Sequence, residues 1–330
     1  MKAICYTNTK TTLPNWVKTL HESQPFGFAY ENNGFFIHLY GTDKGIQTIS
    51  PGLTVVEKKQ NNQTLKNWAI KTFGATNIKK MNSDVGTVKK LIWRPGLYYY
   101  DELKSALDYD EFDKKNSEQS LTILLQKLSE ILLFIEPSVK SSKTYSHKLR
   151  ELLILSCTEF ENQITSILEK HNIAPIGRNY NTNDYVKVNN LAYLYNYIIS
   201  FKNYSIFNNI IPFKNWNSQN PTKSLKWYDS YNKTKHNKNV YFNESTLENT
   251  INAIAANIIM FCVKFGPYSL YHDMSVLSSL INQMLHISFN KDLKQTFYLP
   301  LIELPTDTSE DLFCYDSYQC KHNKPWLSII

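Results

Sequence analysis

The chain has 330 residues, with 36 lysines and arginines against 29 aspartates and glutamates, so its formal net charge is +7. Hydrophobic residues make up 42% and aromatic residues 14%, which is enough for a packed core and excludes a disordered chain. Five scattered cysteines exclude a disulfide scaffold, and the first residues lack the apolar stretch of a secretory signal. We therefore expect a cytoplasmic protein of about two domains without a membrane-spanning segment.

The positive charge is almost entirely lysine, because the sequence contains only three arginines, Arg94, Arg150 and Arg178. Abundant lysine with scarce arginine most often reflects an AT-rich genome. A basic balance also suits a polyanionic partner, since lysine neutralises phosphates and releases their counterions. Composition alone leaves both interpretations open.

Strand-like patterns are prominent in residues 1–115, which we expect to form a mixed, β-rich domain. Phe26–Tyr30 and Phe35–Tyr40 are aromatic-rich runs. The residues between them, Glu31–Gly34, include asparagine and glycine, which accept positive φ and favour a hairpin turn. Two further elements are expected in this domain, a strand at Gly52–Val56 and a helix at Thr64–Phe73.

Helical periodicity begins at residue 116 and predicts a bundle over residues 116–290, followed by an irregular extension over residues 291–330. Apolar residues recur in the bundle at intervals of three and four. Asn116 or Ser117 is expected to cap the first helix, which Pro137 ends. The other expected helices are Thr144–His171, Asp184–Phe201, Ser224–Asn237, Leu247–Phe265 and one within residues 267–290.

The helix expected at Leu247–Phe265 has the strongest signals. Ser245 and Glu248 match a capping box, in which a hydroxyl and a carboxylate each satisfy a free N–H group, and Gly266 suits the other end. Its apolar core is too short to span a bilayer and is interrupted by asparagine, so we expect a buried helix.

These patterns predict an α+β protein, with a mixed, β-rich N-terminal domain followed by an all-α bundle. The extension contains one β-like patch, at residues 297–304. The aromatic run Tyr98–Tyr100 suits either a base-stacking surface or a buried strand edge.

The strongest candidate site lies in the segment Trp227–Lys238, WYDSYNKTKHNK. On a helix, residues three and seven positions apart lie on nearly the same face, which places Asp229, Asn232 and His236 in one polar stripe. The neighbouring stripe contains Tyr228, Tyr231 and Lys235.

This pattern indicates proton transfer beside a phosphate. Histidine ionises near neutrality, so His236 can take a proton from a 2′-hydroxyl or return one to a leaving oxygen. Lys235 or Lys238 can stabilise charge that develops on the phosphorus oxygens. The alternative is a solvated helix face on which His236 only pairs locally.

The helix expected at Thr144–His171 offers a companion set of charged residues. Glu159 falls at the border of its apolar stripe, where a buried carboxylate needs a partner, and Arg150 and Glu161 lie on similar faces. These residues either form a salt bridge between helices, or Arg150 or Glu159 completes the His236 site.

Cofactor and metal sites are not expected. The sequence lacks the phosphate-binding glycine loops, the G-x-S-x-G elbow and the H-E-x-x-H motif, and it has only 10 glycines. Cys314, Cys320 and His322 have no fourth ligand nearby and the wrong spacing for a zinc finger.

The helical half resembles the HEPN superfamily, helical proteins that include many prokaryotic toxin and anti-phage ribonucleases. The resemblance covers about residues 118–290 and rests on three passages, YSHKLRELLILSCTEFE from Tyr145, WYDSYNKTKHNK from Trp227 and STLENTINAIAANIIMF from Ser245. It implies a homodimer in which two histidines face a shared cleft.

The nuclease signature of that superfamily is an arginine followed, after four to six residues, by a histidine. If His236 is that histidine, the positions for the arginine hold Tyr231, Ser230 and Asp229. A different cation would then have to act, and the candidates are Lys233, Lys235, Lys238 and Arg150.

Three hypotheses follow from the sequence. The first is an RNA-targeting, metal-independent endoribonuclease or toxin-like effector in bacterial anti-phage defence, with His236 as general acid–base. The second is a catalytically inactive, dimeric HEPN-like module that binds RNA, a nucleotide or a partner protein, and the third is a dimeric scaffold. The expected site comprises His236, Asn232, Asp229 and Lys235 for catalysis and Tyr231, Lys238, Arg150 and Glu159 for binding.

Overall fold

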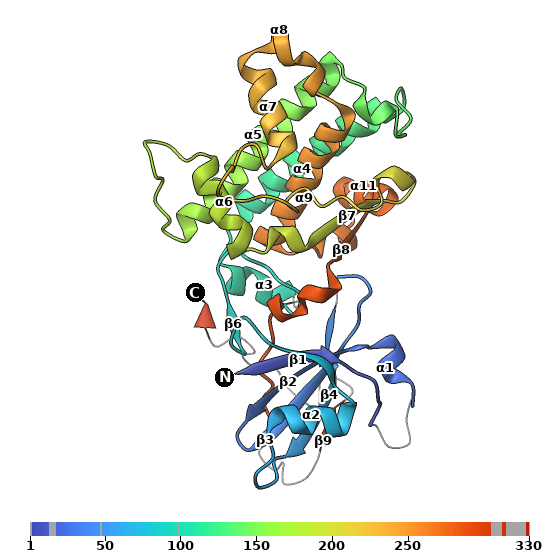
Figure 1. Ribbon diagram of the computed structural model, residues 1–330, viewed down its shortest axis with the longest axis vertical. Coiled ribbons are helices and arrows are strands. Elements are labelled where there is room, and N and C mark those ends of the chain that lie inside the picture. The colour runs from blue at the N-terminus through green and yellow to red at the C-terminus, as the bar shows by residue number, and fades with distance from the viewer. Residues whose placement is uncertain are drawn as a thin grey trace. The chain divides into compact units, whose positions relative to one another are not determined.

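The computed structural model describes residues 2–12, 18–46, 48–97, 100–304, 312–314 and 328–329. As the sequence predicts, the protein is α+β, with an N-terminal antiparallel sheet followed by a largely helical region (Figure 1). It divides into two compact units. The first comprises Met1–Lys89, Arg94–Glu102 and Lys291–Ile330, and the second comprises Lys90–Trp93 and Leu103–Asn290.

The first unit contains an antiparallel sheet with the strand order β5-β1-β2-β3-β4-β9. The predicted hairpin is confirmed, because Asn32 pairs with Phe35 and both residues of the turn, Asn33 and Gly34, have positive φ. The predicted strand at Gly52–Val56 lies within β4. The strands are β1 (Ala3–Thr7), β2 (Phe26–Asn32), β3 (Phe35–Gly41), β4 (Ile49–Lys58), β5 (Thr76–Lys80) and β9 (Leu312–Cys314).

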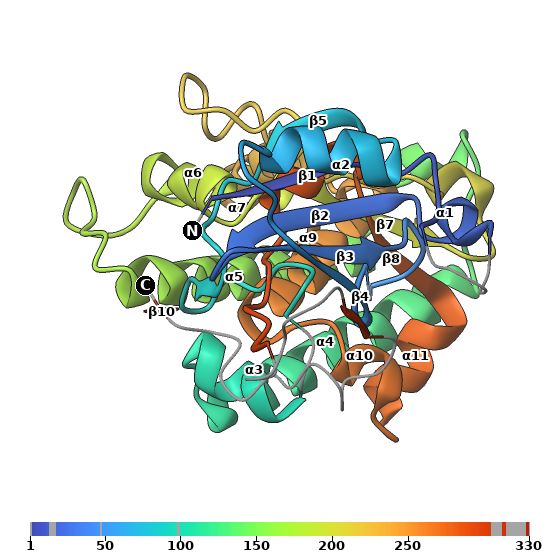
Figure 2. The same cartoon turned by 90° about the horizontal axis from the view of Figure 1, so that it is seen from below.

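Helix α2 (Leu65–Phe73) packs on this sheet and supplies much of its core (Figure 2). Thr64 caps it and Gly74 ends it in the left-handed conformation, so the predicted helix is confirmed. Trp68 stacks on Phe36 of β3 with ring centroids 5.1 Å apart. The other short elements of the unit are α1 (Leu20–Ser23), η5 (Lys291–Thr296) and the parallel pair β6 (Thr87–Val88) and β10 (Ser328–Ile329).

A buried histidine lies in the same core. His38 of β3 is fully buried, and its Nδ1 is 2.6 Å from the hydroxyl of Tyr6. Its ring stacks on Phe73 at 3.7 Å between centroids, while its Nε2 has no hydrogen-bond partner in the described part of the chain. Burial holds the pKa of His38 well below its ordinary value, so the ring is neutral.

The second unit is built around α9 (Leu247–Phe265), which packs against α4 (Glu111–Leu132), α5 (His147–Lys170) and α7 (Lys226–His236). Nearly all of α9 is buried, as predicted. Asn257, one of the asparagines in its apolar run, donates to the carbonyl oxygens of Ser156 and Ala253 and accepts from Gln163. No helix in the described residues is long and apolar enough to cross a membrane.

The remaining elements of this region are short. Strands β7 and β8 pair antiparallel, so the region is largely but not entirely helical, and the expectation of an all-α bundle is wrong in this detail. These elements are α3 (Tyr100–Leu107), η1 (Ser141–Lys143), α6 (Thr182–Leu191), η2 (Leu194–Asn196), β7 (Tyr197–Phe201), η3 (Ser205–Phe207), α8 (Lys238–Tyr241), η4 (Phe242–Glu244), α10 (Ser269–His272), α11 (Val276–Met284) and β8 (Leu285–Phe289).

The predicted start of one helix is wrong, and so is the predicted cap of α9, although α9 begins at Leu247 as predicted. Helix α4 begins at Glu111, because the side chain of Asp110 caps it by accepting from the backbone N–H of Asp113; Asn116 and Ser117 lie inside it. At α9 the capping residue is Thr246, which accepts from the N–H of Asn249. Ser245 and Glu248 therefore form no capping box.

Three predictions of longer elements are also wrong. The helix expected at Asp184–Phe201 ends at Leu191, because Tyr193 adopts the left-handed conformation and the β-branched and aromatic residues that follow form β7. In place of the single helix expected within residues 267–290, the structure has the helices α10 and α11 and the strand β8. Residues 297–304 form no strand.

Candidate functional site

Helix α7 is held in the second unit by its aromatic face. Trp227, Tyr228 and Tyr231 are buried, and the rings of Trp227 and Tyr228 lie 5.1 and 6.0 Å from that of Phe160 on α5. The indole of Trp227 also donates to the carbonyl oxygen of Pro212. This packing fixes the helix and leaves its charged side chains partly or fully exposed.

The end of α7 and the start of α8 place three sequence-predicted residues at the surface, at one end of the second unit (Figure 1). His236, Lys235 and Lys238 are all exposed, and Asn237 between them caps α8 by accepting from the N–H of Val240. The imidazole of His236 makes no hydrogen bond or ion pair with any described residue. It is therefore accessible to a ligand.

Arg150 approaches the same end of α7 from α5. Its Nη2 donates to the carbonyl oxygen of Thr234 at 3.0 Å. Carbonyl groups in the last turn of a helix are partly negative and lack partners within the helix, so a guanidinium stabilises them. Arg150 thus supports the turn that holds His236, and no carboxylate of the described residues is bonded to it.

Asp229 is engaged by a lysine. Its Oδ2 is 2.7 Å from the Nζ of Lys233, one turn along α7, and this hydrogen bond raises the pKa of Lys233. Asn232, the third member of the predicted polar stripe, is half-buried. The structure thus gives Asp229 a partner other than the imidazole of His236.

Tyr231 stands where the arginine of the HEPN signature could stand. Its ring is fully buried, and burial raises the pKa of Tyr231. The Nζ of Lys235 donates to its hydroxyl at 2.8 Å and lies 5.0 Å from the ring centroid, and this hydrogen bond raises the pKa of Lys235. Tyr231 therefore positions Lys235.

The two glutamates of α5 that the sequence singled out, Glu159 and Glu161, have different partners. Glu161 accepts a hydrogen bond from the hydroxyl of Tyr228, and burial beside that carboxylate raises the pKa of Tyr228. Glu159 accepts from Nε2 of Gln163 at 3.1 Å, and it makes no bond to α7 within the described residues.

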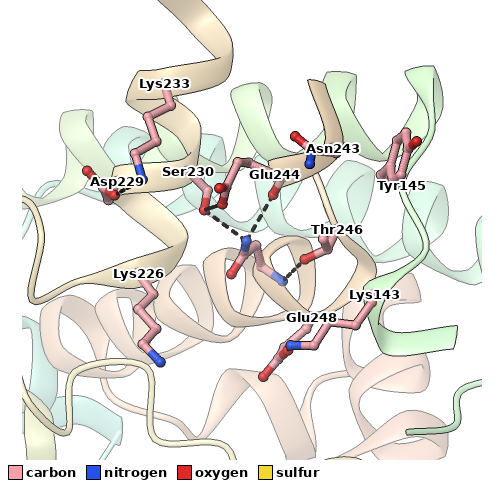
Figure 3. A pocket seen from close by; sticks show the side chains of 11 residues that line it. Lys143, Tyr145, Lys226, Asp229, Ser230, Lys233, Asn243, Glu244, Thr246 and Glu248 are labelled. Atoms are coloured by element: carbon pink, nitrogen blue, oxygen red, sulfur yellow. Dashed lines mark hydrogen bonds and ion pairs between the residues drawn. The ribbon is translucent and has the colours of Figure 1, made fainter. Parts of the chain in front are cut away.

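A polar pocket of about 490 Å³ opens beside α7 (Figure 3). Of the candidate site residues named from the sequence, Asp229 and the alternative cation Lys233 line it. The signal that could have revealed it is the spacing of Lys226, Asp229 and Lys233, which share one helix face. The lining residues are Lys143, Tyr145, Lys226, Asp229, Ser230, Lys233, Asn243, Glu244, Thr246, Glu248 and Asn249.

Some predicted features lie outside the part of the chain that the structure describes. Among these are Cys320, His322, Tyr98 and Tyr99, whereas Tyr100 begins α3. Within the described part, no three histidine, cysteine, aspartate or glutamate side chains are grouped so that they could hold a metal ion.

No protein-family model, curated protein or solved structure matches this chain. The resemblance to the HEPN superfamily therefore rests on the three sequence passages alone. What the site does has to be inferred from its own geometry.

Proposed function

We propose that this is a HEPN-like, RNA-targeting protein whose contact surface is the last turn of α7 and the start of α8. The observation that supports the proposal is the joint exposure of His236, Lys235 and Lys238 at this one helix end. The rest of α7 is held by its buried aromatic face, so these three side chains project from a fixed support.

Lysine and histidine at this position suit the RNA backbone. The ammonium groups of Lys235 and Lys238 neutralise phosphates, and the imidazole of His236 acts as general acid–base in metal-independent cleavage. His236 takes the proton of a 2′-hydroxyl, whose oxygen attacks the adjacent phosphorus to form a cyclic phosphate. The 5′-oxygen leaves and receives a proton, which a second His236 supplies in the homodimer that the resemblance implies.

Binding without cleavage is the second candidate, and one observation favours it. Asp229 is paired with Lys233, so this carboxylate does not orient the imidazole of His236. A histidine without an orienting partner is a weaker general base.

The test of cleavage uses purified protein and total RNA in EDTA. Loss of cleavage in His236→Ala, with cleavage retained in His272→Ala, would support the nuclease. His272 is the matched control because it is exposed on α10, away from α7. Cleavage by neither wild type nor control, together with RNA binding, would support the second candidate.

The test of binding compares two lysine variants on a short single-stranded RNA. Removing one phosphate contact should lower the slope of log affinity against log salt by about 0.7 in Lys238→Ala. Lys223→Ala removes an equal charge from the exposed turn before α7 and should leave the slope unchanged. If wild-type protein binds no RNA, the proposed function is wrong.

A further inference from the structure

The pocket beside α7 has a fixed polar floor. The hydroxyl of Ser230, which is 3% exposed, donates to Oε2 of Glu244 at 3.2 Å and accepts from Nδ2 of Asn249 at 2.9 Å. The same amide group donates to the backbone oxygen of Glu244 at 2.9 Å. Three elements, α7, η4 and α9, are joined by these bonds, so the carboxylate of Glu244 is held in place (Figure 3).

Among the described residues, two of the lysines that line the pocket are paired with carboxylates, and a third is not. Lys233 is paired with Asp229, and Lys143 is paired with Glu248. The exposed ammonium of Lys226 has no ion pair or hydrogen bond with a described residue. An anionic group of a ligand can therefore bind Lys226 without breaking an existing ion pair.

One aromatic ring is accessible at the pocket. Tyr145 is 49% exposed, and its ring meets the ring of Phe242 edge to face at 5.6 Å between centroids. Phe242 supports the tyrosine on one side. The remaining exposed surface of the ring can stack with a flat, unsaturated group.

The face of α7 that lines the pocket continues to His236. Lys226, Asp229, Lys233 and His236 follow one another at intervals of three and four residues, so they share a helix face. The first three line the pocket, and His236 lies at the next step of the same stripe. A chain bound along this stripe would reach both the pocket and the imidazole.

We propose that the pocket binds one nucleotide of single-stranded RNA, which deepens the proposed function and rests on it. Its phosphate binds Lys226, its base stacks on Tyr145, and its ribose 2′-hydroxyl donates to Glu244. A fixed carboxylate is a recurrent partner of ribose hydroxyls, and the 2′-hydroxyl is the group that distinguishes RNA from DNA. The pocket therefore selects RNA, while the end of α7 contacts the backbone without that selection.

The first experiment measures fluorescence anisotropy with a short RNA and with DNA of the same sequence. Glu244→Gln keeps the size and the bond from Ser230 but loses the charge, and it should reduce the preference for RNA over DNA about tenfold. Glu169→Gln, an exposed glutamate of α5, should change nothing. An unchanged preference in Glu244→Gln would overturn the role of Glu244.

Two further variants test the phosphate and the base. Lys226→Ala should weaken binding of RNA and DNA equally, whereas Lys223→Ala is the matched control. Tyr145→Ala should weaken both about tenfold, and Tyr145→Phe should restore binding because the ring stacks without its hydroxyl. If Phe and Ala behave alike, stacking on Tyr145 is refuted.

The second experiment titrates the four nucleoside 5′-monophosphates by calorimetry. RNA binding that depends on Lys238 but not on Lys226, Glu244 or Tyr145 would refute the pocket and leave the proposed function intact. Nucleotide binding that Lys226→Ala abolishes, without any RNA binding, would refute the proposed function and make a free nucleotide the ligand. Binding of neither RNA nor a nucleotide would refute both.

Discussion

The neutral, buried His38 should make the stability of the first unit fall in weak acid. In the native protein its pKa lies well below 6.5, whereas in the unfolded chain it returns to about 6.5. Below that pH the unfolded state binds a proton that the native state does not, so the free energy of unfolding decreases as the pH falls.

The size of this effect follows from the difference in pKa. Each pH unit below the unfolded value costs about 1.4 kcal/mol while the native ring stays neutral, so a drop to about pH 5 costs about 2 kcal/mol. The packing hinders protonation of the native imidazole, because the ring stacks on Phe73 and Nδ1 already contacts the hydroxyl of Tyr6.

The assay is urea unfolding at about pH 7.5 and about pH 5 for wild type and His38→Phe, which keeps the stacked ring but cannot titrate. The variant should lose about 2 kcal/mol less than wild type over this range. Tyr6→Phe should be less stable at both pH values but keep the wild-type dependence, since His38 remains. His272→Gln controls for an exposed histidine.

Equal pH dependence in wild type and His38→Phe would refute the reasoning. It would mean that the native structure admits the charged imidazole, either by hydration of Nε2 or by rearrangement around Tyr6. The difference between the two proteins, rather than either curve alone, is decisive because carboxylates titrate in the same range.

Three other substitutions have defined outcomes. Gly96→Ala should destabilise the protein by at least about 3 kcal/mol in thermal unfolding, because Gly96 has a φ of 103° and a Cβ there would lie 2.0 Å from the backbone oxygen of Tyr298. Asn257→Ala should cost about 2–4 kcal/mol in urea unfolding, since its amide makes three hydrogen bonds in the core. In alkali, burial lowers the pKa of Lys264 despite its 2.8 Å ion pair with Asp113, so this lysine adds stability as the pH rises toward about 10.5, and in urea unfolding Lys264→Met should lose more stability than wild type over that range.

Matched variants separate these causes from general effects of substitution. Gly177→Ala should be tolerated, because no atom lies within 4 Å of its Cβ position. Asn252→Ala removes a single bond, to the oxygen of Glu248, and should cost less than Asn257→Ala. Equal changes of stability with pH in wild type and Lys264→Met would contradict the role of Lys264.

Local signals in the sequence were sufficient for much of the fold. The hairpin at Asn33–Gly34 and the helix capped by Thr64 are specified by residues within a few positions of each other. The strand β7 was missed because Ile198 and Ile199 suit an apolar helix stripe as well as a strand, and its partner β8 is more than 80 residues away. The start of α4 was missed because the cap at Asp110 precedes the apolar periodicity.

The candidate site was predictable only along one helix. Spacing placed Asp229 and His236 on one face of α7, and the four-residue spacing of Asp229 and Lys233 was the unused signal that Lys233 pairs with this carboxylate. The pocket depends on Glu244, Asn249 and Tyr145, which come from elements that approach α7 only in the folded unit. Such pairings depend on tertiary packing, which no local periodicity encodes.

The pairing of β4 with β9 bears on how the chain folds during translation. Val55 pairs with Phe313, so the ribosome must synthesise the whole helical unit before this edge of the sheet is covered. During that time β4 presents unpaired backbone groups, which can recruit strands of other nascent chains. Expression at lower temperature or with a chaperone should therefore improve the soluble yield of the intact chain more than that of a fragment limited to the helical unit.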